Sequence, residues 1–133
     1  MELSRFNTRK GAEQGYDLTL VDLNGARTDI VITLLGADSK TYQDKLREHQ
    51  RRRLSMISRT RRLTQSPEEL DSEALELTVA ATTGWIGMEM NGAEFPYSEE
   101  NARSLYSDYP AIREQVDVAI NERANFLPRD AIS

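Results

Sequence analysis

Apolar and polar residues alternate in two short stretches near the start of the chain. Six residues recur at every second position in these stretches: Tyr16, Leu18, Leu20, Ile30, Ile32 and Leu34. Asn24-Gly25 stands between the two stretches, and this dipeptide is the strongest short-range signal for a hairpin turn. The pattern predicts a β-hairpin over residues 16–35. A lone hairpin is marginally stable, so its apolar face must pack on a helix or meet strands of another copy.

The residues before the hairpin follow neither the strand period nor the helix period. Residues 1–15 mix charged side chains with Gly11 and Gly15. Chain ends are poorly ordered unless other contacts hold them. We therefore expect residues 1–15 to form an arm that is flexible or is ordered by a partner.

A helical spacing begins after the hairpin. Asp38 or Ser39 can cap a helix that we expect from about residue 40 to about residue 63. One thin stripe of that helix carries Tyr42, Leu46, His49, Arg53 and Ile57. The sequence Ser66-Pro67-Glu68-Glu69 is a capping box with proline at the first helical position. It predicts a second helix that reaches about Thr82, with Gly84 free to take the conformation that ends a helix.

Two more helix starts follow in the last third of the chain. Asn91-Gly92 signals a tight turn, and Ser98 can cap a short helix. Asp108 and Pro110 open the last helix. Four apolar residues recur at intervals of four along one face of it: Ile112, Val116, Ile120 and Ala124. The whole pattern predicts a mainly α, α+β single domain over residues 1–133, with the N-terminal hairpin followed by about four helices in a helical part at 40–127.

Length and composition exclude several classes of protein. The chain has 133 residues, 38% of them hydrophobic and 29% charged, which fits one soluble globular domain rather than a disordered chain. We find no apolar run of membrane-spanning length and no signal peptide, so we expect a cytoplasmic protein. The sequence contains no cysteine, which excludes disulfides, thiolate metal sites and a cysteine nucleophile.

The titratable residues do not form a catalytic pattern. His49 is the only histidine, and a metal site would need further imidazole or thiolate ligands. Four glutamates near residue 95 could supply a carboxylate pair or a cation site, although capping and solubilising roles fit them equally well: Glu89, Glu94, Glu99 and Glu100. No nucleophile triad and no glycine-rich phosphate loop is evident. We expect no enzyme, no catalytic residues and no bound cofactor or metal.

The predicted helix at 40–62 is strongly basic within an acidic chain. Nine bases and two acids give it a formal charge of +7, whereas the whole chain carries −5, so the remaining residues total −12. The helix can pair with its own acidic successor, or meet acidic surface on a neighbouring copy, or bind nucleic acid. The acidic total and the lack of interleaved aromatics weigh against nucleic acid. The candidate self-association residues are Arg51, Arg52, Arg53, Glu68, Glu69 and Glu73.

The order of residues in the last third resembles the tail assembly chaperones of long-tailed, non-contractile bacteriophages, the lambdoid type most closely. The residues that carry the resemblance are Trp85, Gly87, Gly92, Pro96, Ser98, Glu99, Asn101, Leu105, Tyr109, Pro110, Asn125, Phe126 and Leu127. The resemblance implies a non-enzymatic assembly factor in the host cell cytoplasm that is absent from the mature virion. Such a factor coats the tape-measure protein and helps to recruit tail-tube subunits, commonly together with a longer form made by translational frameshifting.

Two apolar segments are candidates for the surface that binds the tape-measure protein. Seven residues make up these segments: Trp85, Ile86, Met88, Met90, Ile112, Val116 and Ile120. Core packing is the competing interpretation for both, and whichever segment remains exposed is the better binding candidate. We also expect the protein to form homo-oligomers. The alternative function is a small nucleic-acid-binding regulator that uses the Arg-rich helix at 40–62, and a hydrolase with carboxylate chemistry is a weaker third.

Overall fold

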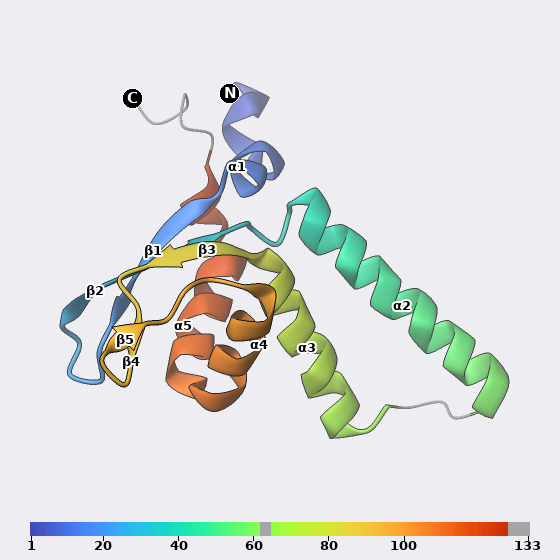
Figure 1. Ribbon diagram of the computed structural model, residues 1–133. Coiled ribbons are helices and arrows are strands. Elements are labelled where there is room, and N and C mark those ends of the chain that lie inside the picture. The colour runs from blue at the N-terminus through green and yellow to red at the C-terminus, as the bar shows by residue number, and fades with distance from the viewer. Residues whose placement is uncertain (62–64, 128–133) are drawn as a thin grey trace.

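A β-hairpin and a group of helices form the chain, which we describe from a computed structural model over residues 1–61 and 65–127 (Figure 1). The mainly α, α+β class is confirmed. The predicted hairpin consists of β1 (Tyr16–Val21) and β2 (Arg27–Leu34), paired antiparallel. In the connecting loop the Asp22 carboxylate accepts the backbone N–H groups of Asn24 and Ala26 at 2.9 and 3.0 Å. This side chain therefore fixes the turn.

A third strand, which the sequence pattern did not reveal, completes the sheet. β3 (Thr82–Ile86) pairs antiparallel with β2, giving the strand order β1-β2-β3. The expectation that Gly84 ends a helix was wrong, because α3 (Pro67–Ala81) stops at Ala81 and the chain enters β3 directly. Gly84 lies opposite Thr33 within the sheet. β3 thus extends the hairpin to three strands, and its apolar face, with Leu20, Ile32 and Leu34, packs on residues of the helices of the same chain.

Three helices lie together on one side of this sheet (Figure 1). They are α3, α4 (Glu99–Asp108) and α5 (Pro110–Asn121). Ser66 caps α3 and Ser98 caps α4 as predicted, each hydroxyl accepting the backbone N–H three residues on. Tyr109 rather than Asp108 occupies the N-cap of α5, and its side chain makes no cap bond. The core comprises Leu20, Ile32, Leu34, Val79, Ala81, Met88, Ala102, Leu105, Tyr106, Val116, Ala119 and Ile120.

The Arg-rich helix α2 (Lys40–Thr60) packs on α3 and forms the outer side of the helical group (Figure 1). It starts after Ser39, as one of the two predicted caps allows, and Arg61 ends it in a left-handed conformation. Positions 62 and 63 of the predicted helix lie outside the described residues. Between α3 and α4 the chain forms a small hairpin of β4 (Glu89–Met90) and β5 (Ala93–Glu94), which confirms the predicted turn.

Residues 1–15 are not a free arm in the structure. They form a 3-10 turn, η1 (Leu3–Phe6), and the helix α1 (Thr8–Gln14). α1 packs on the C-terminal 3-10 turn η2 (Arg123–Phe126), and Ala12 is fully buried there. The Thr8 hydroxyl also donates to Asp38 at 2.7 Å. The sequence pattern missed this helix because so short an element is stabilised by contacts distant in sequence rather than by its own period.

Candidate binding surface

Trp85 and its neighbours hold the chain between β3 and α4 in place. The Trp85 Nε1–H donates to the Phe95 carbonyl at 2.8 Å, and the two rings stack with centroids 5.8 Å apart. Tyr97 meets the Trp85 ring edge-on at 5.2 Å, and its hydroxyl donates to the Thr82 carbonyl at 2.8 Å. The Asn101 amide donates to the Pro96 carbonyl at 2.9 Å. Several of the residues that carry the resemblance, among them Trp85, Pro96 and Asn101, are therefore linked in one local unit, which we call the Trp85 unit.

Three of the seven predicted partner-binding residues are buried. Val116, Ile120 and Met88 belong to the core, so assigning them to a partner surface was wrong for the folded chain. They pack against apolar residues of α3, α4 and the sheet. Ile112 and Trp85 are partly buried against that core.

Two of the candidates remain exposed, but on separate parts of the molecule. Ile86 is 68% exposed and lies opposite Val31, on the sheet face away from the core. Met90 is partly exposed in the β4–β5 hairpin. The seven predicted residues therefore do not form one continuous surface.

An apolar surface does form between β1 and α5, where the sequence pattern did not locate one. Two hollows of about 420 and 410 Å³ share Val21 and Gln115 as lining residues, and we call them together the β1–α5 groove. Six apolar residues contribute much of its lining: Leu18, Val21, Leu23, Tyr109, Ile112 and Val118. Leu23 and Val118 are 91% and 64% exposed. Val118 lies outside the buried apolar stripe of α5. An apolar residue at this position was the signal in the sequence that could have indicated a second apolar surface.

Gln115 joins the two sides of the groove. Its side-chain carbonyl accepts the Val21 N–H at 2.9 Å, and its amide group donates to the Val21 carbonyl at 2.9 Å. Both backbone groups of Val21 are therefore bonded at the free edge of the sheet. No feature of the sequence indicated this contact, because the two residues are 94 positions apart.

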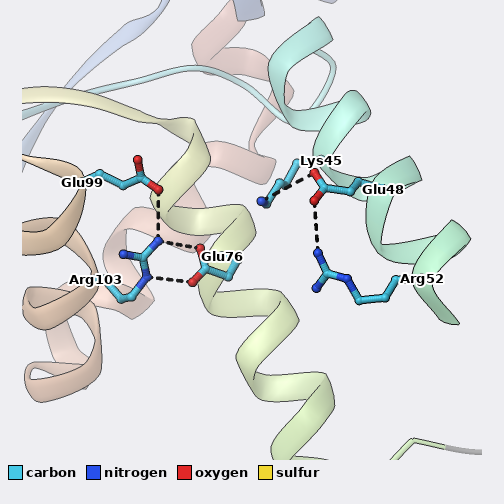
Figure 2. A network of polar contacts seen from close by, with 6 residues as sticks. All are labelled: Lys45, Glu48, Arg52, Glu76, Glu99 and Arg103. Carbon is cyan, nitrogen blue, oxygen red and sulfur yellow. Dashed lines mark hydrogen bonds and ion pairs between the residues drawn. The ribbon is translucent and has the colours of Figure 1, made fainter. Parts of the chain in front are cut away.

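The bases of α2 mostly pair within the same chain. Arg53 donates to Glu73 on α3 at 2.9 Å and to Gln65 at 2.8 Å. Figure 2 shows Glu48 between Lys45 and Arg52 on α2 itself, at 3.6 and 3.1 Å. Arg53 therefore pairs with the acidic helix that follows, as one interpretation of the basic helix expects, whereas Lys45 and Arg52 pair with an acid of α2 itself. The pairs are partly exposed, so each contributes at most about 1 kcal/mol.

The candidate self-association residues differ in exposure and in their partners, and Arg52 is both exposed and paired with Glu48. Arg53 and Glu73 bind each other within one chain, and the Glu69 N–H donates to the Ser66 cap at 3.2 Å. Arg53 and Glu73 therefore already have a partner within one chain, and their role in contacts between copies stays a prediction. Arg51, Arg52 and Glu68 are exposed. Arg51 also lines a hollow of about 530 Å³ along α2, whose lining is mainly charged.

A second polar cluster fixes α4 to α3. Arg103 donates to both Glu76 carboxylate oxygens at 2.7 and 2.9 Å, and to Glu99 at 3.1 Å (Figure 2). The hydrogen bonds from Arg103 hold the pKa of Glu76 below its usual range. Glu99, one of the four glutamates considered for carboxylate chemistry, thus has a structural partner.

His49 is the buried histidine of the α2–α3 contact. Its side chain is only 2% exposed, and its Nδ1 has no hydrogen-bond partner among the described residues. Burial lowers the pKa of His49 below its usual 6.5, with Lys45 and Arg52 adding to the shift and Glu73 and Glu48 opposing it. The imidazole is therefore neutral in the folded chain near neutral pH.

We expect the protein to lose stability as the pH falls below about 6.5, because the unfolded chain then binds a proton that buried His49 resists. Urea unfolding at about pH 7.5 and about pH 5.5 measures this loss. Glu73 and Glu76 titrate in the unfolded chain near 4.5, below that window. The variant His49→Leu should show a smaller loss between the two pH values. An equal loss in both proteins would contradict the assignment to His49.

Neither a metal cluster nor a spanning helix occurs in the described part of the chain. Within residues 1–61 and 65–127, no group of three or more histidine or acidic side chains is arranged to hold a metal ion. No helix there is both long and apolar enough to cross a bilayer. No protein-family model matches the chain, and comparisons with curated proteins and with solved structures give no match either.

Proposed function

We propose that this protein is a non-enzymatic tail assembly chaperone of a long-tailed bacteriophage. It would bind and solubilise the tape-measure protein in the host cytoplasm, help to recruit tail-tube subunits, and be absent from the mature virion. The tube protein could be reached through a longer, frameshifted form. Self-association into homo-oligomers along the tape-measure protein belongs to the same proposal, and Arg51, Arg52 and Glu68 are its exposed charged candidates.

The uncovered β1–α5 groove carries this proposal. Exposed contiguous apolar surface on a small domain is typical of a site that binds another protein. Leu23 and Val118 expose large apolar side chains beside the groove, although the same chain has a well-formed core. A chaperone that keeps apolar segments of a long partner apart needs such a surface. The chemistry is binding without turnover.

The residues that carry the resemblance to tail assembly chaperones lie partly in the Trp85 unit. Trp85, Ser98 and Asn101 each make a side-chain hydrogen bond that fixes the segment between β3 and α4. In this chain the residues that carry the resemblance therefore have a structural role. The motif therefore supports a common fold element rather than a common catalytic site.

Co-expression with the tape-measure protein of the same genome tests the function. We expect the soluble fraction of the tape-measure protein to rise severalfold when this chain is present, without added nucleotide or metal. The soluble and pelleted fractions are compared by gel. The core variant Val116→Asp, which we expect to be unfolded, is the matched negative control.

Two results would contradict the proposed function. The first is a tape-measure protein that is equally insoluble with and without the intact chain. The second is tight, salt-sensitive binding of duplex DNA by the purified protein, measured by fluorescence anisotropy, which would favour the regulator that uses α2.

A further inference from the structure

We propose that the β1–α5 groove takes an amphipathic helix whose apolar face is flanked by lysine or arginine. This inference rests on the proposed function, because it specifies the chemistry of the segment that the chaperone binds. It concerns a surface that lies apart from the Arg-rich helix α2 and from the Trp85 unit. Three observations lead to it: the apolar residues of the lining, the acids at its margin that have no ion-pair partner among the described residues, and the blocked edge of β1.

The lining of the groove supplies an apolar strip. Val21 and Gln115 belong to both hollows, so the two hollows adjoin along α5, one beside the hairpin loop and the other toward the C-terminal end of the helix. Leu23 lies in the hairpin loop and Val118 in the C-terminal half of α5, and both are largely exposed. An apolar face of a partner that covers these side chains removes them from water and gains the corresponding free energy.

Four acidic residues line the groove, and no lysine or arginine of the described residues lines either hollow. The acids are Asp22, Asp108, Glu114 and Glu122. None of them forms an ion pair with another described residue, whereas many other acids of the chain do. Charge complementarity across an interface favours a partner of opposite sign and speeds its association. The groove therefore selects bases beside the apolar face of its occupant.

The free edge of β1 is poorly suited to take an added strand. An incoming strand needs free backbone N–H and C=O groups at the edge, and Gln115 already binds both groups of Val21. The register of β1 also shifts between Thr19 and Val21, which interrupts regular pairing there. With the edge blocked, an occupant must use its side chains. A helix presents an apolar face while satisfying its own backbone.

The length of the groove fits a helix of moderate length. α5 has 12 residues and forms one wall. At about 1.5 Å per residue, this wall is about 18 Å long, which corresponds to about three helical turns in the partner.

Binding of synthetic peptides tests the inference. The probe is a fluorescein-labelled amphipathic peptide of about 14 residues, with leucines on one face at the helical spacing and lysines on both sides of that face. The first comparison peptide has glutamates in place of the lysines, and the second has serines in place of the leucines. We expect the lysine–leucine peptide to bind at least tenfold more tightly than either, by fluorescence anisotropy.

Substitutions in the groove locate the binding site. Leu23→Ser and Val118→Ser should each weaken binding of the lysine–leucine peptide about fivefold to tenfold, because each removes apolar contact area. Glu114→Gln should weaken it about twofold to threefold and reduce its salt dependence. Leu54→Ser on α2 is the matched control, since Leu54 is 67% exposed and distant in sequence from the groove. This control should bind as the unaltered protein does.

Three results would overturn the inference: equal binding of the lysine and glutamate peptides, unchanged binding by both groove variants, or an equal loss in Leu54→Ser. Circular dichroism checks that each variant is folded. If the Val118→Ser variant is not folded, the Leu23→Ser variant in the hairpin loop still tests whether the peptide binds in the groove. A tape-measure protein kept fully soluble by the double variant of Leu23 and Val118 would also overturn the groove assignment, yet leave the chaperone function standing. Peptide binding without any effect in co-expression would contradict the function instead.

Discussion

Replacing Val116 by aspartate should unfold the protein. Val116 is 0% exposed in the core formed by α3, α4, α5 and the sheet. A carboxylate at this position meets apolar core residues. Burying its charge without an ion-pair or hydrogen-bond partner costs about 4 kcal/mol or more, which is a large part of the stability of a typical domain. Far-UV circular dichroism and urea unfolding measure the effect.

The matched control lies two residues further along the same helix. Val118 is 64% exposed, so Val118→Asp introduces the same carboxylate into solvent and should change the free energy of unfolding by less than about 1 kcal/mol. Both variants alter α5 equally in helix propensity. A folded Val116→Asp protein of nearly normal stability would contradict the described core.

Gly87→Ala should destabilise the protein by about 2–4 kcal/mol. Gly87 has a φ of +78°, a conformation that side-chain-bearing residues rarely adopt, and an added Cβ would lie 2.2 Å from the Asp29 carbonyl oxygen. The backbone of β2 cannot shift to make room for this Cβ without disturbing the pairing of β2 with β3. Urea unfolding measures the loss, and near-UV circular dichroism reports on Trp85 two residues before.

Gly84→Ala provides the comparison for this effect. An added Cβ at Gly84 meets no atom within 4 Å, and its φ lies outside the left-handed region. Alanine there should be neutral or stabilise by about 0.5 kcal/mol through the unfolded chain. Equal stabilities of the two alanine variants would show that the close approach of Gly87 to β2 is not rigid. Gly87, one of the residues that carry the resemblance, thus has a specific steric reason to be glycine.

The groove and the core divide the apolar residues of α5 between them. Val116 and Ile120 face inward, Val118 faces outward, and Ile112 contributes to both the core margin and the groove. This division explains why a candidate list drawn from the strongest apolar stripe selected core residues. The stripe with the best helical period is the one that folding itself buries.

Local signals in the sequence were sufficient for most helices and for the hairpin. Alternation around Asn24-Gly25 predicted β1 and β2, and the serines at 66 and 98 marked the starts of α3 and α4. These features depend on residues within a few positions of one another. The mainly α, α+β class followed from the same patterns, because hydrophobic period and capping act over one or two turns.

Contacts between distant residues decided the rest. β3 is a short Thr-Thr-Gly-Trp-Ile segment whose glycine reads as a helix end, and only pairing with β2 makes it a strand. α1 is helical because it packs on η2, from the opposite end of the chain. The β1–α5 groove exists because Gln115 meets Val21 across 94 positions. Sequence alone determined which segments could form helices and turns, whereas tertiary packing chose which apolar faces were buried and which remained open, since burial depends on partners that no local pattern specifies.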